Sequence, residues 1–337
     1  MKKNVLYLGN NLSSSKTNVS YMKGLSAALE RTGFKVLCKS AYLHKVRRLF
    51  DMIQATIRFG SRMDYALIDT YSTQNFYYAV VVSQVCRLMH LPYVPILHGG
   101  NLPRRLEASP KLSTALFKSA KVLVSPSQYL ESVFKTYGYT HVVYIPNSLQ
   151  IAQYSFKERP IDTIKLLWVR SFSTIYNPKL AVDILKQLLD AGQHAELCMV
   201  GPDTDGSMDV VKAYAKTLGV PITLTGKLTK PEWTHLAKDY NVFINTTNFD
   251  NMPVSVIEAM ALGLPIVSTN VGGMPFLIDN GVDGVLVSPN DCEAFVEAIL
   301  KVAQDTEGTK LMVSNARKKV EKFDWEVVKL QWMDILS

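Results

Sequence analysis

Short apolar runs alternate with amphipathic stretches along nearly the whole chain, and this alternation constrains the fold more than any other feature. Six apolar runs of the first half have the length of strands: 5–8, 35–38, 65–69, 93–98, 121–125 and 142–145. Helical stretches, such as 21–31, 75–89 and 129–137, separate them. Strands that alternate with helices form parallel sheets that helices cover on both faces. The pattern therefore predicts an α/β fold with a doubly wound parallel sheet.

The alternation pauses at residues 147–163, a polar stretch, and then restarts with the apolar run 165–169. A chain of 337 residues exceeds the usual size of one hydrophobic core. We therefore expect two domains of the same type, covering residues 1–155 and 156–322. Residues 323–337 have apolar positions at helical spacing and are predicted to form a closing helix.

Residues 249–273 are the segment most informative about function. Asp250 and Glu258 are acids with seven residues between them, the first before a predicted helix and the second inside it. Asn251 and Pro253 suit a helix start, and Gly263 suits its end. The start of a helix presents unpaired N–H groups and the positive end of its dipole, so it can bind a diphosphate.

This segment resembles the donor-binding signature of retaining glycosyltransferases of family four. The run Glu258-Ala-Met-Ala-Leu-Gly-Leu-Pro follows the family pattern position by position, and Gly272-Gly273 completes it. Asp250 and Phe276 depart from the pattern, because the family usually has Glu at the first position and often at the second. The resemblance implies a GT-B fold, with two Rossmann-like domains that face each other across a cleft. It also implies that the C-terminal helix returns to the first domain.

The resemblance further implies an N-terminal acceptor domain and a C-terminal domain that binds a UDP- or GDP-sugar. Arg170 follows the predicted strand 165–169 and corresponds to the family's Arg, which holds the diphosphate. The family's Lys falls on Tyr176, so either Lys179 replaces it or one cation suffices. Glu258 is expected to accept hydrogen bonds from the ribose hydroxyls, and Asp250 from the transferred sugar.

Three residues are expected to be catalytic: His98, Arg170 and Asp250. His98 ends the apolar run 93–97 and precedes two glycines, a position that the family uses near the sugar's 6-hydroxyl. The other positions expected to bind the donor are Gly9, Gly201, Lys227, Asn251, Met252, Pro253 and Val254.

We expect neither a metal nor a further cofactor. A helix N-terminus together with Arg170 can neutralise a leaving diphosphate without metal. The four cysteines, Cys38, Cys86, Cys198 and Cys292, lack CxxC spacing, which argues against zinc and favours reduced thiols in a cytoplasm.

The charge of the chain is asymmetric. Residues 1–160 hold 21 Lys and Arg against 7 Asp and Glu, a balance of +14, whereas residues 161–337 hold 16 against 22, a balance of −6. This asymmetry points to an anionic partner of the first half, either anionic lipid headgroups or an acidic glycan. Nucleic acid is not expected, because no zinc-finger or RNP-type pattern is present.

The segment 42–62 carries part of this charge. Its apolar residues Leu43, Val46, Phe50, Ile53 and Ile57 are predicted to share one helical face that packs on the first sheet. A basic face with Arg47, Arg48, Arg58 and Arg62 would then meet an anionic membrane. A plain solvated face is the alternative.

The sequence thus predicts a metal-independent retaining glycosyltransferase in the cytoplasm or on the inner face of the membrane. Its acceptor would be a glycan or a lipid-linked molecule of cell-surface polysaccharide or glycolipid biosynthesis. No signal peptide and no membrane span is expected. Two alternatives remain, a nucleotide-sugar epimerase or hydrolase on the same fold and a non-catalytic nucleotide-sugar-binding protein.

Overall fold

The computed structural model describes residues 3–9, 21–40, 42 and 44–337. The chain divides into two compact units. Unit 1 comprises residues 1–147 and 325–337, and unit 2 comprises residues 148–324. The polar stretch at which the alternation pauses begins at this division, and the functional boundaries at 155/156 and 322/323 stay predictions.

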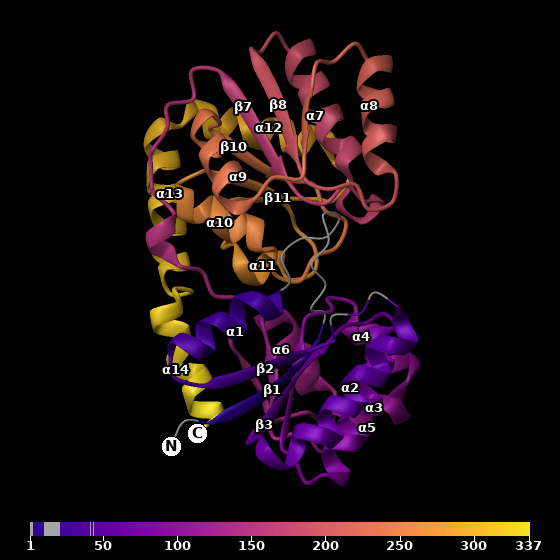
Figure 1. Ribbon diagram of the computed structural model, residues 1–337. Helices are drawn as coiled ribbons and strands as arrows, with labels where there is room; N and C mark the ends of the chain where they lie inside the picture. The colour runs from indigo at the N-terminus through magenta and orange to yellow at the C-terminus, as the bar shows by residue number, and fades with distance from the viewer. Residues whose placement is uncertain (1–2, 10–20, 41, 43) are drawn as a thin grey trace. The chain divides into compact units, whose positions relative to one another are not determined.

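Unit 1 contains a six-stranded parallel sheet in the order β2-β1-β3-β4-β5-β6 (Figure 1). Its strands are β1 (Asn4–Leu8), β2 (Lys35–Lys39), β3 (Tyr65–Thr70), β4 (Tyr93–Leu97), β5 (Leu123–Ser125) and β6 (Val142–Tyr144). Its helices are α1 (Tyr21–Arg31), α2 (Lys45–Phe59), α3 (Asn75–Leu88), α4 (Leu102–Ala108), α5 (Pro110–Phe117), α6 (Gln128–Thr136) and α14 (Trp325–Ile335).

Helices cover both faces of this sheet. On one face, α1 and α14 pack on β1, with Leu29 and Trp332 against Val5 and Tyr7. On the other face, residues of α2, α3 and α5 surround Leu6 and its neighbours. The expectation that the last helix joins the first domain is therefore confirmed.

Unit 2 contains a second six-stranded parallel sheet, in the order β12-β11-β10-β7-β8-β9. Its strands are β7 (Ile164–Val169), β8 (Ala195–Val200), β9 (Thr223–Gly226), β10 (Val242–Asn245), β11 (Ile266–Thr269) and β12 (Val285–Val287). Its helices are α7 (Pro178–Asp190), α8 (Ser207–Thr217), α9 (Lys230–Leu236), α10 (Val254–Leu262), α11 (Met274–Leu277), α12 (Cys292–Gln304) and α13 (Thr306–Glu321).

Each sheet has one point at which the strand order reverses, between β1 and β3 in unit 1 and between β7 and β10 in unit 2. The loops that leave neighbouring strands diverge there, and ligands of open α/β sheets bind in the resulting crevice. Gly9 and Asp69 lie at the first reversal point, and Arg170 follows β7 at the second. The topology thus brings residues far apart in sequence together at two strand edges.

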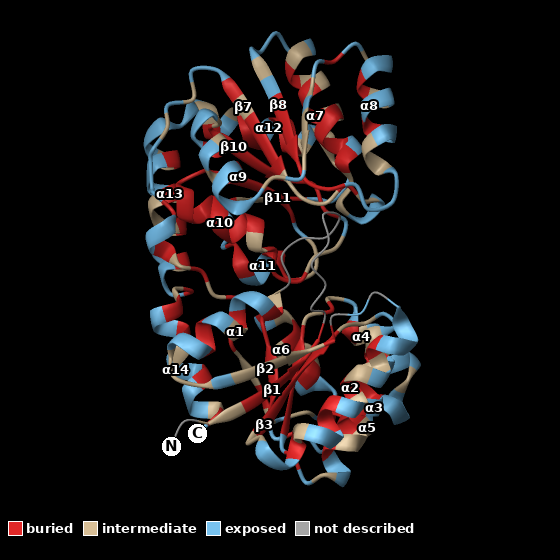
Figure 2. Ribbon diagram, viewed as in Figure 1, coloured by how far each residue is buried: buried red, intermediate tan, exposed pale blue. Residues whose placement is uncertain are grey.

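α10 begins one residue after Pro253 and ends at Gly263, as the sequence predicted. The N-cap residue is Pro253 rather than Asn251, and Pro253 makes no capping hydrogen bond with its side chain. Residues 255–262 are all buried, so this helix has no solvent-facing side (Figure 2).

The prediction for segment 42–62 is wrong about which face packs inward. Arg48 is buried, while Val46, Phe50 and Ile57 are exposed. Leu43 lies outside the described residues. Within the described part of the chain, no helix has the length and hydropathy that a membrane crossing requires.

Candidate functional site

The second reversal point holds a buried ion pair. Arg170 leaves the end of β7, and its guanidinium contacts the Asp250 carboxylate in the loop after β10. The side chains are 13% and 12% exposed. The ring of Tyr176 lies under the guanidinium, with its centroid 4.0 Å from Arg170 Cζ. Tyr176, which stands where the family pattern has Lys, therefore orients the Arg170 guanidinium.

Burial raises the pKa of the Asp250 carboxyl, and the Arg170 guanidinium and the Asn251 N–H oppose that rise. The N–H of Asn251 donates to Asp250 Oδ1 at 2.9 Å. The Gly273 N–H donates to the Asp250 carbonyl at 2.9 Å. A Cβ on Gly273 would lie 1.7 Å from the Asn251 carbonyl oxygen, so this close approach requires glycine.

Two buried donors of unit 2 have no acceptor among the residues that the structure describes. They are Arg170 Nε and Ser255 Oγ. Ser255 lies in the first turn of α10, where the backbone N–H groups of Val254 and Ser255 also lack a partner among the described residues. Buried polar groups are normally paired, so unpaired donors at a helix start fit an anionic ligand.

Glu258 lies one turn further along α10 and is 3% exposed. Its Oε1 accepts a hydrogen bond from the Tyr154 hydroxyl at 2.7 Å and contacts Lys230 Nζ at 2.8 Å. The Glu258 carboxylate and burial together raise the pKa of Tyr154, which keeps its hydroxyl a donor. In the described part of the chain Oε2 has no partner, so one carboxylate oxygen is fixed and the other is available.

Two glycines lie at the ends of β8 and β9, Gly201 directly after β8 and Gly226 as the last residue of β9. Gly201 donates its N–H to the Gly226 carbonyl at 2.9 Å and has φ 153°. A Cβ on Gly201 would lie 1.7 Å from the Arg170 carbonyl oxygen. Gly201 therefore lets the chain pass directly against the start of the Arg170 loop. Lys227 follows Gly226 and is exposed.

Lys179 does not accompany Arg170. It lies in the first turn of α7, and its ammonium sits 4.3 Å from the ring centroid of Tyr214 on α8. Of the alternatives that the sequence left open, this position favours a single cation at the diphosphate. Residues 251–253 are buried immediately before α10, and their expected role in donor binding stays a prediction.

The first reversal point holds a second cluster, centred on Asp69 at the end of β3. Asp69 Oδ1 lies 2.9 Å from His98 Nε2 and accepts the Tyr7 hydroxyl at 2.8 Å. The His98 ring packs against Tyr21 and Tyr71, with centroids at 4.7 and 5.3 Å. Burial and the Asp69 charge raise the pKa of Tyr7, so its hydroxyl donates to the carboxylate.

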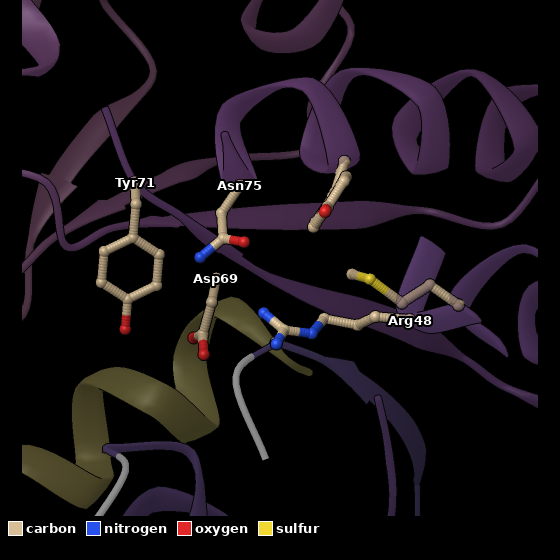
Figure 3. Close-up of a pocket in the computed structure, with 7 residues that line it drawn as sticks. Arg48, Asp69, Tyr71 and Asn75 are labelled. Atoms are coloured by element: carbon tan, nitrogen blue, oxygen red, sulfur yellow. The ribbon is translucent and has the colours of Figure 1, made fainter. Parts of the chain in front are cut away.

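Asp69 also lines a small pocket of unit 1, and sequence reasoning missed it because no local pattern marks Asp69. Figure 3 shows the Arg48 guanidinium directed toward the Asp69 carboxylate, with Tyr71 and Asn75 beside them. Arg48 Nε donates to the Tyr42 carbonyl at 2.9 Å. Gly9 belongs to the same pocket, at the end of β1.

Comparison with known proteins decides the family of unit 2. Residues 163–305 match the sequence profile of the family described as Glycosyl transferases group 1. This part of the chain is a group 1 glycosyltransferase domain. The match covers all of the site described for unit 2 except Tyr154.

Relatives with known names align over part of the chain. The sulfoquinovosyl transferase SQD2 of Arabidopsis thaliana is 29% identical over 148 residues, which are 43% of this chain and 28% of that protein. The capsular polysaccharide biosynthesis glycosyltransferase CapM of Staphylococcus aureus is 28% identical over 158 residues, 46% of this chain and 40% of that protein. The alignments thus span less than half the length of these relatives.

A solved structure extends the similarity of fold beyond the glycosyltransferase domain. HepE of Anabaena, crystallised with UDP-glucose, matches with a TM-score of 0.75 over 99% of both chains, at 19% identity. The predicted GT-B fold is confirmed by this match.

Proposed function

We propose that this chain is a retaining glycosyltransferase that moves a sugar from a UDP-sugar to a glycan or lipid-linked acceptor. The observation that carries the proposal is a pair of buried donors without an acceptor in the described part of the chain, Arg170 Nε after β7 and Ser255 Oγ in the first turn of α10. They lie in a group 1 glycosyltransferase domain, beside a carboxylate that Arg170 holds in place.

In this proposal the diphosphate of the donor lies at the N-terminus of α10. When the anomeric C–O bond breaks, negative charge grows on the leaving diphosphate. Arg170 and the N–H groups of Val254 and Ser255 stabilise that charge, and the buried site strengthens the interaction. This arrangement needs no metal in the leaving-group step.

Glu258 and Asp250 bind the parts of the donor on either side of the diphosphate. Tyr154 and Lys230 hold Glu258 through Oε1, which leaves Oε2 to accept from a ribose hydroxyl. Asp250, held by Arg170, accepts from a hydroxyl of the transferred sugar. The structure of HepE with UDP-glucose supports uridine as the base.

His98 is the proposed catalytic residue of unit 1. Because Asp69 is a carboxylate acceptor, it favours the tautomer of His98 with the proton on Nε2. Nδ1 then remains an acceptor for a sugar hydroxyl. Asp69 is accordingly a positioning residue.

The acceptor class and the location are also proposed. CapM is named for capsular polysaccharide biosynthesis, which supports a cell-surface glycan or its lipid-linked precursor. The four cysteines form no disulfide, which supports the cytoplasm or the inner face of a membrane.

A thermal-shift screen followed by a product assay tests the proposal. We expect UDP and a UDP-sugar to raise the melting temperature more than GDP or ADP compounds, since ligand at 100 times its Kd stabilises by about 2.7 kcal/mol. UDP release that depends on an acceptor supports transfer. Release without acceptor would instead indicate a hydrolase, and binding without turnover on any acceptor would indicate a binding protein.

A further inference from the structure

The outward side of α2 is apolar. Val46, Phe50 and Ile57 are 66%, 69% and 56% exposed, and Ile53 is half-buried between them (Figure 2). These positions, at i, i+4, i+7 and i+11, form one stripe along the helix. Over 15 residues the helix is about 22 Å long, so the stripe runs along much of one side of unit 1.

The inward side of α2 is mixed, because two core residues, Met52 and Ala55, lie among polar side chains. Arg48, Met52, Ala55 and Thr56 are its buried residues. Thr56 donates its hydroxyl to the Met52 carbonyl at 2.8 Å within the helix. Because Arg48 is directed into the Asp69 pocket, the helix cannot roll its apolar stripe inward without removing that side chain.

Cations flank the exposed stripe. Lys45, Arg47, Arg58 and Arg62 are exposed, and none lies within ion-pair distance of a carboxylate in the part of the chain that the structure describes. The single acid of the helix, Asp51, accepts the Ser40 N–H at 2.8 Å. The surface around the stripe is therefore basic.

We propose that α2 docks on an anionic lipid surface, with Val46, Phe50 and Ile57 inserted among the headgroups and the four cations on the phosphates. An exposed apolar stripe flanked by Lys and Arg is the pattern of helices that lie in a membrane interface. A second copy of the chain fits less well, because a symmetric contact would place the same cations opposite one another. The inference does not depend on sugar transfer.

Vesicle co-sedimentation of the full chain tests this docking. The vesicles are phosphatidylcholine with increasing phosphatidylglycerol, in low and high salt. The stripe variant carries Val46→Ser, Phe50→Ser and Ile57→Ser, and the charge variant carries Gln at the four cations. Leu311→Ser, at a 63% exposed position of unit 2, is the matched control.

We expect wild type and the Leu311→Ser control to bind anionic vesicles alike. The stripe variant should bind at least about tenfold more weakly in low salt, because its serines no longer insert apolar area at the acyl boundary. The charge variant should lose its dependence on phosphatidylglycerol. Equal binding of wild type and the stripe variant, or no binding of wild type at any composition, would overturn the proposal.

A second measurement reports insertion directly. Phe50→Trp places an indole in the stripe, and lipids brominated along their acyl chains quench a fluorophore that inserts. We expect quenching of Phe50→Trp beyond that of wild type in anionic vesicles, with none in a Leu311→Trp variant. Equal quenching of Phe50→Trp and Leu311→Trp would refute lipid docking. Lipid docking would also be refuted if the only effect of the stripe variant were to dissociate a dimer.

Discussion

The strand order reverses once in each sheet, and the side chains at the two reversal points differ in chemistry. In unit 2 a carboxylate after β10 pairs with an Arg after β7, and two buried donors, Arg170 Nε and Ser255 Oγ, have no acceptor in the described part of the chain. In unit 1 a carboxylate at the end of β3 meets a His and a Tyr, and each is hydrogen-bonded. A site with spare donors is suited to an anion, whereas a cluster whose His and Tyr already share one carboxylate is suited to the hydroxyls of a sugar.

This difference assigns separate tasks to the two strand edges. The edge of unit 2 should bind the charged part of the donor, and its loss should affect the step in which charge develops. The residues at the strand edge of unit 1 should affect the orientation of the substrate more than the stabilisation of its developing charge. Each prediction below changes one side of this comparison.

The largest effect is expected from Arg170→Ala. Arg170 meets charge that grows in the transition state, so kcat should fall by about 10²–10³, or about 2.7–4 kcal/mol in activation free energy. The measurement is the steady-state rate of UDP release, with the fold checked by circular dichroism. Arg87→Ala, on the exposed side of α3, is the control and should leave the rate unchanged. A near-normal kcat in folded Arg170→Ala would remove Arg170 from the mechanism.

A smaller effect, mainly on KM, is expected from Glu258→Gln. The ribose does not change during transfer. Loss of its contact with Glu258 therefore weakens binding of the ground state and of the transition state alike. We expect KM for the donor to rise about tenfold, or about 1.4 kcal/mol, with kcat changed less than in Arg170→Ala. A larger loss of kcat in Glu258→Gln than in Arg170→Ala would reverse the assigned roles.

The residues that meet at the strand edge of unit 2 are easier to predict from sequence than those of unit 1, for a physical reason. The Asp250–Glu258 segment is contiguous, so its helix start, spacing and glycine end are readable without tertiary contacts. Asp69 and His98 meet only because β3 and β4 are neighbours, and nothing local marks Asp69. Tyr154 and Lys230 likewise reach Glu258 from segments 104 and 28 residues away in sequence.

The order of strands and helices was also predictable, since it follows from alternation alone. The orientation of α2 was not, because periodicity locates a stripe without saying which way it faces. Burial of Arg48 beside Asp69 reverses the usual inference that the apolar side packs inward.

A modest effect is expected from Asp69→Asn. The amide can also donate to His98 and so no longer favours the tautomer with the proton on Nε2. We expect kcat/KM to fall about tenfold and its pH profile to shift, while UDP affinity stays that of wild type. Unchanged rate and pH profile would show that Asp69 only supports the fold around Tyr7.

No effect is expected from chelation. Metal independence is expected partly because no Asp-x-Asp metal motif was recognised at a strand end, yet Asp203 and Asp205 form an Asp-x-Asp pair shortly after β8. Asp203 accepts the Gly206 N–H, and Asp205 accepts from Ser173, Thr174 and Ser207. Hydroxyl and N–H donors lower the pKa of Asp205, so it is ionised and occupied. We expect full activity in EDTA; complete loss, restored by manganese or magnesium, would contradict the leaving-group chemistry.

The central claim is that Arg170 and the start of α10 hold a diphosphate, and calorimetric titration of UDP against UMP tests it most directly. The account predicts that wild type binds UDP at least about tenfold more tightly than UMP, a difference of about 1.4 kcal/mol. In Arg170→Met with Ser255→Ala that preference should largely disappear, while UMP affinity changes little. Equal affinity of wild type for UDP and UMP, or an undiminished preference in the double variant, would contradict it.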